Sequence, residues 1–429
     1  MQFHLLSFEG PDPYARVGGL ATRVEGLAAT LAGQGFETHL WFVGDPALPG
    51  YETRGSLHLH RWCQWVSAYH PEGVYAGEGP KEREFAASLP RYLVREVLGP
   101  HLRNGGRAVV LAEEWHTVHA TIGLHDLLEQ AGLRERATLL WNANNVYGFE
   151  GLPWARLAEV ARITTVSRYM KHRMREWGVD ATVVPNGLHE DAFEPPSRAA
   201  VAALRGRFRG RTVLTKMARF DPHKRWLETV GLVAELKRAG WQPLLVARGG
   251  CEPHGDDVRA AMRTSGLRVV ERRPARAGQE GLVAALCGAG DADVIELRNH
   301  VDPDARRVLF RGADAVLANS GHEPFGLVGL EAMAAGGLAC TGCSGEDYAL
   351  GGHNALVLET GDPREFIRLF DWLRRHPNEA RAMRRAGQAT ARRYAWDEVV
   401  RRALLPRLGV APRRVVTVAP PGALTRLLA

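Results

Sequence analysis

The chain has 429 residues, of which 45% are hydrophobic and 24% charged, and its formal net charge is +7. This composition is that of a globular protein, and the length predicts two or three domains of ~100–200 residues each. No apolar run approaches the ~20 residues that span a bilayer, so membrane insertion is not expected. The arginines are spread along the chain without aromatic clusters, so nucleic-acid binding is not expected either.

The chain begins with MQFHLLSF, a predicted strand at residues 1–8 that lacks the basic and long apolar regions of a secretory signal. We therefore expect a cytoplasmic protein. Strands and helices alternate through the first half, which predicts a parallel sheet with helices on both faces. The predicted helices are residues 18–33 and the segment after residue 112, and the other predicted strands are residues 37–43, 108–112, 138–141 and 163–166.

The alternation is interrupted at residues 183–196, VVPNGLHEDAFEPP, a turn-rich stretch that predicts a linker between domains. It then restarts with a helix at residues 226–239 and strands at residues 211–218, 243–247, 267–270, 294–297 and 315–318. The pattern predicts two doubly wound α/β domains in tandem with a cleft between them. A last helix is expected at residues 396–408, and the tail at residues 409–429 has no clear element.

Ligands of open parallel sheets bind beyond the carboxyl ends of the strands, so residues that follow strands are candidate site residues. In YARVGGL, Gly18 and Gly19 precede a helix, and their backbone amides could approach a phosphate. A tight turn explains the two glycines equally well, because neither dinucleotide nor P-loop spacing is present. In EEWHT, His116 begins a helix directly after a strand, which makes it a candidate catalytic residue. The alternative is that His116 has only a structural role. His116 and His119 have the spacing of a metal pair, but without a third ligand no zinc site is predicted.

The segment ARFDPHKRW follows the first strand of the second half and carries Arg219 and Lys224 on either side of a proline turn. Two cations at the start of a helix oppose the helix dipole. An anion between them, most simply a diphosphate, would remove that conflict. This segment is the clearest indication of a phosphate site.

The segment HEPFGLVGLEAMAAGG, residues 322–337, places Glu323 just after a strand and Glu331 within the following helix. Free amides at the helix start, residues 326–328, could bind a second face of the same anion. Glu331 could accept the vicinal hydroxyls of a ribose. The alternative is an acidic turn before a half-buried helix, which needs no function.

Three short motifs match metal or redox patterns only by their letters. Cys340 and Cys343 form a CxxC pair, but the five cysteines include no second pair, so neither zinc nor a disulfide framework is expected. The pairs Asp291–Asp293 and Asp302–Asp304 match the DxD of metal-dependent transferases. Both lie in the second predicted domain, where a tandem fold predicts no metal.

Taken together, these motifs resemble those of retaining glycosyltransferases of the GT-B fold, in family 4 and the glycogen and starch synthase group, over residues 1–408. EPFGLVGLE fits their E-x7-E pattern with Glu323 and Glu331, and ARFDPHK is similar to their donor-phosphate pair. EEWHT resembles a WH segment of the synthases, and VPNGLHEDAFEPP their interdomain segment. ARVGGL resembles their KVGGL signature with Arg16 in place of lysine, and WNANNVYGFEG is loosely similar to an HN..Y.G segment.

The resemblance implies a Rossmann-like acceptor domain at residues 1–187 and a donor domain at residues 188–395. Residues 396–429 would form a crossover helix and tail that pack on the first domain. It also implies a donor site for a nucleotide-diphosphate sugar. Arg219 and Lys224 would neutralise the diphosphate, Glu331 would hold the ribose, and Glu323 would contact the sugar near the reacting carbon. His116 would lie in the pocket for the donor sugar. The other donor-site residues would be Arg16, Gly18, Gly19, Phe325, Gly326, Leu327 and Val328. Asn144 and Asn145 would lie on the acceptor side.

The implied activity is retaining hexosyl transfer without a metal or cofactor, in which the departing phosphate accepts the acceptor's proton. Glucose is the favoured sugar and an α-glucan the favoured acceptor. One alternative is a small-molecule or lipid-linked acceptor of a cell-envelope glycan; for a lipid-linked acceptor, residues 90–103 could form a membrane-facing helix. Another alternative is a catalytically inactive protein that senses a nucleotide sugar. A nucleotide-sugar 2-epimerase or a phosphorylase is not favoured, because neither the acid/base set nor a pyridoxal-phosphate lysine is found. The base, the oligomeric state and the role of the tail stay open.

Overall fold

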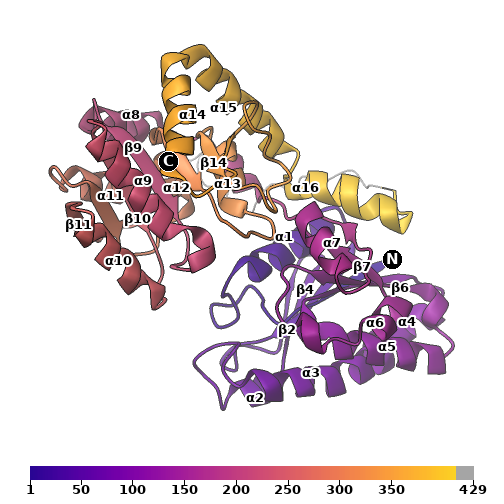
Figure 1. The fold of residues 1–429 in the computed structure, drawn as a ribbon. Coiled ribbons are helices and arrows are strands. Elements are labelled where there is room, and N and C mark those ends of the chain that lie inside the picture. The colour runs from indigo at the N-terminus through magenta and orange to yellow at the C-terminus, as the bar shows by residue number, and fades with distance from the viewer. Residues whose placement is uncertain (412–429) are drawn as a thin grey trace, which may run out of the picture. The chain divides into compact units, whose positions relative to one another are not determined.

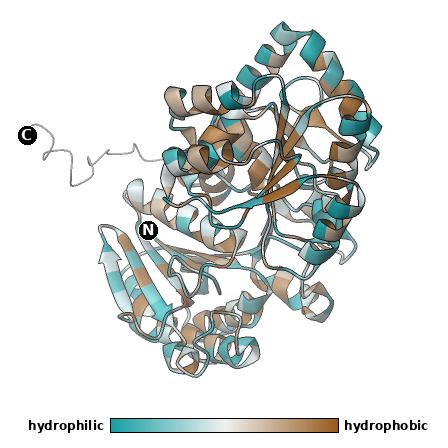
Figure 2. Ribbon diagram, turned by 90° about the vertical axis from the view of Figure 1, so that its left-hand side faces the viewer, coloured by the Kyte–Doolittle hydropathy of each residue, from teal (hydrophilic) through white to brown (hydrophobic). Residues whose placement is uncertain are grey.

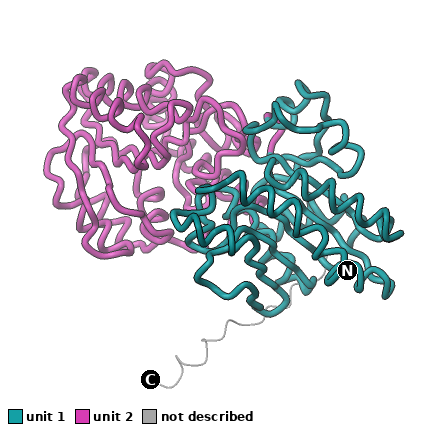
Figure 3. Tube along the Cα trace, turned by 90° about the horizontal axis from the view of Figure 1, so that it is seen from below, with its two compact units in different colours: residues 1–166, 170–187, 396–429 teal, residues 167–169, 188–395 magenta. Residues whose placement is uncertain are grey.

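The structure is a computed structural model that describes residues 1–411 (Figure 1). The chain divides into two compact units (Figure 3). The first comprises Met1–Val166, Met170–Gly187 and the described residues from Trp396 onward. The second comprises Ser167–Tyr169 and Leu188–Ala395. Each unit is built on one sheet, which confirms the predicted α/β class with two doubly wound sheets.

The sheet of the first unit has eight strands in the order β3-β4-β2-β1-β5-β6-β7-β8. All neighbours pair in parallel except β3 and β4, an antiparallel hairpin at one edge that the sequence analysis did not predict. The inner strands β1 and β5 are buried along their whole length, as expected for parallel strands covered on both faces. The strands are β1 (Gln2–Leu6), β2 (Glu37–Val43), β3 (Tyr51–Arg54), β4 (Leu57–Trp62), β5 (Ala108–Glu113), β6 (Ala137–Ala143), β7 (Arg162–Thr165) and β8 (Thr182–Val183).

The helices of the first half follow the predicted alternation, with one difference at residues 90–103. That stretch is the end of a longer helical segment, which contains a π-helical turn at Leu93–Val97. Pro100 follows this turn, and its nitrogen cannot donate a hydrogen bond to it. The helices are α1 (Gly19–Gly33), α2 (Gln64–Ser67), α3 (Glu78–Tyr92), α4 (Leu98–Arg103), α5 (Val118–Gln130), α6 (Trp154–Val160) and α7 (Arg168–Arg175).

The last described helical segment packs on the first unit through Trp396. This side chain lies where Gly26 of α1 and Gly187 leave room, since a Cβ added at either glycine would come within 2.5 Å of the indole. The segment consists of α16 (Trp396–Val399), a π-helical turn at Val400–Leu404 and a 3-10 turn at Leu405–Leu408. It is helical over the predicted range but not α-helical throughout, because Pro406 cannot donate a backbone hydrogen bond. The predicted irregular tail lies mostly outside the described residues.

The sheet of the second unit has seven strands, all parallel, in the order β11-β12-β10-β9-β13-β14-β15. The short strands β14 and β15 were not predicted. The strands are β9 (Thr212–Met217), β10 (Pro243–Arg248), β11 (Val269–Arg272), β12 (Val294–Leu297), β13 (Ala315–Ala318), β14 (Ala339–Thr341) and β15 (Leu356–Val357). The helices are α8 (Arg198–Arg207), α9 (Trp226–Arg238), α10 (His254–Thr264), α11 (Gly278–Cys287), α12 (Pro303–Gly312), α13 (Leu327–Ala334), α14 (Pro363–Arg375) and α15 (Pro377–Arg392).

Hydrophobic side chains of the second sheet alternate between two buried clusters, one on each face. Leu214 and Leu245 pack with α9, α10 and α14, whereas Val213 and Leu244 pack with α8, α11 and α12. In Figure 2, brown hydrophobic residues are concentrated on strands inside the upper part of the molecule, whereas the strands at the lower left carry both teal and brown. Within residues 1–411 no helix has the length and apolar character needed to cross a bilayer. The cytoplasmic location stays a prediction.

Candidate functional site

The carboxyl ends of the neighbouring strands β9 and β13 bring two predicted residues into contact in the second unit. Lys224, in the 3-10 turn after β9, donates a hydrogen bond to the carboxylate of Glu323, which follows β13. The two segments are also joined by the backbone, since the Gly321 N–H donates to the His223 carbonyl at 2.7 Å. Both side chains of the ion pair are about one-fifth exposed. The cation and the carboxylate therefore hold one another while remaining accessible.

Arg219 lies on the same β9–α9 connection and is exposed. Its carbonyl accepts the indole N–H of Trp226 at 2.8 Å, which fixes the backbone of the turn. Within the described residues its guanidinium forms no ion pair, so its charge is available to an anion. Arg225, between Lys224 and α9, adopts a left-handed conformation with φ 52°, which a non-glycine residue reaches only at a cost. The turn thus presents two cations on a backbone that is held in place.

The start of α13 lies beside Glu323. Gly326 precedes the helix with φ +75°, and a Cβ there would lie 2.7 Å from Cγ of Glu346 and 3.2 Å from Cγ of Glu323. Only glycine satisfies both the conformation and the close approach. The first N–H groups of the helix have no side-chain cap, so they remain possible donors to an anion. Of the predicted residues here, Phe325 is buried, and Gly326, Leu327 and Val328 are half-buried.

Glu346 is a site residue that the sequence analysis missed. It is 5% exposed, and within the described residues neither of its carboxyl oxygens has a hydrogen-bond partner. Burial, together with the charge of Glu323, raises the pKa of Glu346 to about 8. The group is therefore largely protonated at neutral pH and can donate a hydrogen bond to a ligand. No spacing in the sequence marks it, because it reaches Gly326 only through the fold.

Replacing Glu346 by glutamine is expected to stabilise the second unit at high pH. The folded protein keeps a proton that the unfolded chain loses above its ordinary pKa of 4.5, so its stability falls as pH rises toward about 8. Glutamine has the same shape and cannot ionise. The gain in unfolding free energy should be roughly 1–3 kcal/mol at pH 8 and close to zero at pH 5.

Urea unfolding of both proteins at the two pH values measures this difference. Glu379→Gln serves as the control, since that residue is exposed on α15. Parallel pH profiles for the wild type and the Glu346 variant would mean that the carboxyl group is already ionised in the folded state.

Glu331, the predicted ribose residue, lies on α13 and forms an ion pair with Arg306 of α12 at 3.1 Å. Its side chain is 18% exposed, and burial raises its pKa while Arg306 opposes that rise. A carboxylate has about four acceptor positions, so the pair leaves room for ligand hydroxyls. Glu331 is thus placed near the helix start but is engaged by a neighbouring cation.

The predicted residue His116 lies in the first unit, in a 3-10 turn at Trp115–Thr117 after β5. Its ring stacks on Phe8 at a centroid distance of 4.2 Å, and its Nε2 lies 2.8 Å from Oε1 of Glu78. Its Nδ1 is buried and has no hydrogen-bond partner in the described chain. Burial lowers the pKa of His116, although Glu78 opposes the shift. The ring is therefore neutral near pH 7 and has one free polar atom.

Glu114, two residues before His116, is a second buried carboxyl group. It is 3% exposed, and burial raises its pKa to about 8 although it accepts the Asn144 N–H at 2.6 Å. Its backbone has φ 69° and ψ 166°, a region that is almost restricted to glycine. Strain of this kind is concentrated at functional sites, which supports the strand end after β5 as part of a site.

The glycine-rich turn before α1 is occupied by a carboxylate of the protein itself. Oε2 of Glu9 accepts the N–H groups of Gly18 at 3.0 Å and Ala21 at 3.1 Å, and Tyr75 donates to Oε1 at 2.6 Å. Gly18 and Gly19 are exposed, but the Gly18 amide is used by Glu9. The amides at this helix start donate to the Glu9 carboxylate, and the predicted contact of Gly18 and Gly19 with a phosphate stays a prediction. The acidic residue in SFEG, directly after the first strand, was the signal in the sequence.

The remaining predicted residues of the first unit have protein partners. Arg16 is exposed and pairs with Glu25 of α1 at 2.5 Å. Asn145 accepts the Tyr147 N–H through its side chain at 2.7 Å. Asn144 donates through its side chain to Glu113 at 2.8 Å, which makes it part of a buried network.

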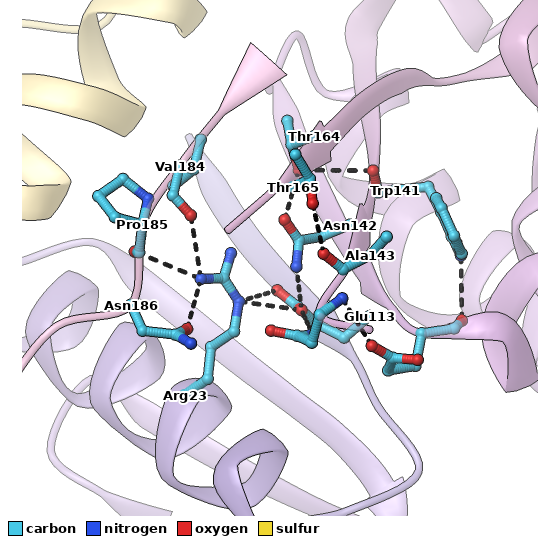
Figure 4. A network of polar contacts seen from close by, with 12 residues as sticks. Arg23, Glu113, Trp141, Asn142, Ala143, Thr164, Thr165, Val184, Pro185 and Asn186 are labelled. Atoms are coloured by element: carbon cyan, nitrogen blue, oxygen red, sulfur yellow. Dashed lines mark hydrogen bonds and ion pairs between the residues drawn. The ribbon is translucent and has the colours of Figure 1, made fainter. Parts of the chain in front are cut away.

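That buried network is centred on Arg23 and Glu113 (Figure 4). The Arg23 Nε–H lies 3.0 Å from both carboxylate oxygens of Glu113, and its Nη1 donates to the Val184 carbonyl and the Asn186 side chain. Asn142 donates to Glu113 and accepts from Thr164. The network borders a cavity of about 10 Å³, which is close to the size of one water molecule. It joins α1, β5, β6, β7 and the residues after β8 within the first unit.

Two family models match the chain. The model described as Glycosyltransferase Family 4 matches residues 17–192, and the one described as Glycosyl transferases group 1 matches residues 283–390. Among curated proteins, D-inositol 3-phosphate glycosyltransferase of Segniliparus rotundus is 28% identical over 54% of this chain and 49% of its own length. The protein of the same name from Xylanimonas cellulosilytica is 26% identical over 56% of this chain and 55% of its own length. The chain thus spans about half the length of these relatives.

Solved structures share the fold over nearly the whole chain. Sucrose-phosphate synthase from Thermosynechococcus elongatus superposes with a TM-score of 0.65 at 19% identity, over 95% of this chain and 98% of that one. The catalytic domain of starch synthase IV from Arabidopsis thaliana, bound to ADP and acarbose, gives a TM-score of 0.64 at 16% identity, over 94% and 99%. Trehalose-6-phosphate synthase from E. coli, bound with UDP-2-fluoro glucose, gives a TM-score of 0.61 at 14% identity, over 93% of this chain and 97% of that one.

Proposed function

The chain belongs to the family 4 glycosyltransferases with the GT-B fold, and from this we propose a retaining hexosyltransferase that uses a nucleotide-diphosphate sugar. The proposed donor sugar is glucose, and the proposed acceptor is a carbohydrate such as an α-glucan. No metal or cofactor takes part in the proposed reaction. The donor site lies on the second unit.

The observation that carries this proposal is the contact between Lys224 and Glu323, with Arg219 on the same turn. A diphosphate at the turn would attract both cations and draw Lys224 away from Glu323. The carboxylate would then be free to accept hydroxyl groups of the donor sugar. The cations would stabilise the charge that develops on the leaving diphosphate, and positioned groups of this kind are a main source of catalysis.

In the proposed reaction the acceptor oxygen forms a bond to the anomeric carbon on the face that the diphosphate leaves. The acceptor's proton passes to the departing phosphate oxygen, so no enzyme nucleophile is required. Glu346 lies beside Gly326 with a raised pKa and without a hydrogen-bond partner among residues 1–411, so it is placed to donate a hydrogen bond to the donor. Glu331 would accept ribose hydroxyls while it keeps its pair with Arg306.

A neutral sugar acceptor is supported by the charges at the carboxyl ends of β1 and β5. Glu9 and Glu78 lie there, and Glu9 already uses the amides of the glycine-rich turn. A phosphate group at that turn would meet a carboxylate and be repelled. Hydroxyl groups, in contrast, can donate to carboxylates, and this favours a glucan over a phosphorylated acceptor.

The second candidate is a small phosphorylated acceptor. The curated relatives at 26–29% identity all carry the name D-inositol 3-phosphate glycosyltransferase, and that name is the observation in its favour. A lipid-linked acceptor and an inactive sensor are the remaining alternatives.

The first experiment is a nucleotide-release assay with UDP-, ADP- and GDP-sugars, with and without glycogen, maltooligosaccharides or inositol 3-phosphate. Release from one glucose donor that glycogen or maltooligosaccharides stimulate is the expected result, and it would also identify the base. Stimulation by inositol 3-phosphate alone would establish the second candidate. Binding without release from any donor would favour the sensor. The anomeric configuration of the product, read by NMR, tests retention, and persistence of turnover in excess EDTA tests metal independence.

Replacing Lys224 by alanine is expected to weaken binding of nucleoside diphosphates by roughly 10–100-fold, because one charge-assisted contact to the phosphates is lost. Binding of the free nucleoside should change by less than about threefold, since it lacks the phosphates. Isothermal titration calorimetry with both ligands measures the two effects. Lys237→Ala is the matched control, because Lys237 is an exposed lysine of the same unit, on α9, whose ammonium pairs with the buried carboxylate of Asp293. An equal loss of affinity for both ligands would contradict the phosphate role.

A further inference from the structure

Histidines gather on one face of the first sheet at the edge that β1, β2, β4 and β3 form. His4, His39 and His58 are cross-strand neighbours on β1, β2 and β4, and His60 lies two residues beyond His58. Side chains two residues apart on a strand point to the same face, so Glu37 shares the face of His39. The His39 and His58 rings stack with centroids 4.6 Å apart. The cluster is unrelated to any motif in the sequence analysis.

Three of these side chains have the arrangement of a metal site. One ligand atom each from Glu37, His39 and His58 lies within 4.8 Å of the other two. Ligands at the ~2.0–2.1 Å that zinc prefers are about 3.3 Å apart in a tetrahedron, so small side-chain rotations would close the site. The three residues do not surround the position completely, since Glu37 is half exposed. Water would therefore supply the fourth ligand, and the metal would have a route from solvent.

His39 gives the second, independent observation. The residue is 7% exposed, and its Nε2 is buried without a hydrogen-bond partner in the described chain. Oε1 of Glu37 lies 3.5 Å from that nitrogen. A buried polar atom without a partner is costly and rare in native proteins. A cation between Nε2 and the carboxylate would satisfy both groups.

Further hydrogen bonds orient the two imidazoles. Nδ1 of His39 lies 3.0 Å from Nε2 of His60, and Nδ1 of His58 lies 2.7 Å from the Tyr51 hydroxyl. Each bond uses Nδ1 and leaves Nε2 for a metal, as is usual when a second group fixes the tautomer of a metal-binding histidine.

We propose that Glu37, His39 and His58 form a structural site for a divalent transition metal of the zinc class, with Tyr51 and His60 as orienting residues. Imidazole ligands favour zinc and its neighbours over magnesium and calcium. Glu37 is the first residue of β2 and His58 the second of β4, so the site lies at the amino ends of the strands. The predicted site residues of this unit follow the carboxyl ends. The metal would therefore hold the unpredicted β3–β4 edge to β2, and catalysis would not require it.

Zinc binding to the full chain tests the proposal. The protein is prepared without a polyhistidine tag, treated with EDTA and desalted, and then titrated with Zn²⁺ against a chromophoric chelator. We expect about one equivalent bound with a dissociation constant near or below about 1 μM. Zn²⁺ should also raise the Tm by several degrees, because it binds the folded state. Cobalt(II) substitution should give visible absorption bands.

The variants separate this site from adventitious binding. His58→Ala and Glu37→Gln change half-buried or exposed side chains at the sheet edge, so folding should survive. Each should weaken Zn²⁺ binding at least about 100-fold and abolish the Tm shift, and Tyr51→Phe should weaken binding about 10–100-fold. The controls His119→Ala and Cys343→Ser, both at exposed positions, should bind as the wild type does. Wild-type affinity in His58→Ala and Glu37→Gln, or no stoichiometric binding at tens of micromolar Zn²⁺, would overturn the proposal.

Discussion

Glu323→Ala is expected to reduce turnover by roughly 10²–10⁴-fold while nucleotide binding changes by less than about threefold. The side chain of Glu323 follows β13, is hydrogen-bonded to Lys224, and lies so near Gly326 that a Cβ added there would be 3.2 Å from its Cγ. In the proposed reaction it contacts the sugar near the anomeric carbon, where positive charge develops. Its loss removes an interaction that strengthens in the transition state and leaves the nucleotide contacts in place.

Steady-state kinetics with the best donor, together with calorimetric titration of the nucleoside diphosphate, separate the two effects. Glu323→Gln keeps the hydrogen-bonding shape without the charge, and its turnover should lie between those of the wild type and the alanine variant. Glu379→Ala, on the surface of the same unit, is the control for nonspecific effects. Equal losses in turnover and nucleotide affinity would mean that Glu323 only shapes the site.

Arg23→Met is expected to destabilise the first unit by roughly 3–5 kcal/mol, the usual cost of removing one partner from a buried ion pair. The side chains of Arg23 and Glu113 are 2% and 1% exposed, so the charge left on Glu113 is not screened by bulk solvent. Methionine has a similar length but leaves Glu113 with only neutral donors from Asn142 and Asn144. The carbonyl of Val184 also loses its donor.

Urea unfolding at pH 7, followed by a probe of the first unit, measures this loss. The double variant with Glu113→Gln should lose less than the sum of the single variants, because the second change removes the isolated charge. Arg91→Met, at an exposed position on α3, should change the free energy of unfolding by less than about 0.5 kcal/mol. Additive losses in the double variant would show that the two side chains are not coupled.

The strands that carry the candidate site were predictable because each is a short buried apolar run. β5, β9, β10, β12 and β13 lie within a few residues of the predicted ranges. The β3–β4 hairpin was missed because LHLHRW has histidines at residues 58 and 60 and an arginine at residue 61, so it lacks a continuous apolar run. Arg61 is nevertheless buried through its ion pair with Asp12 at 2.7 Å. A partner far along the chain thus decides the burial of a charged residue.

The site itself was predictable only in part, because it too depends on contacts between residues that are far apart in the chain. The spacing of Glu323 and Glu331 and the cations at Arg219 and Lys224 are local features that sequence can display. The contact between Lys224 and Glu323 joins residues 99 positions apart and depends on the parallel pairing of β9 and β13. The burial of the Glu346 carboxyl group, which has no hydrogen-bond partner within residues 1–411, depends on the fold and leaves no local signal in the sequence.

Trp396, seated against Gly26 and Gly187, has a consequence for synthesis of the protein on the ribosome. The first unit needs a residue that is translated only after the whole second unit, although domains usually fold in the order in which they emerge. Until Trp396 arrives, the surface around the two glycines is exposed to water and to other nascent chains. Completion of the first unit therefore has to wait until the second unit has been translated, and termination before residue 396 would leave that surface uncovered.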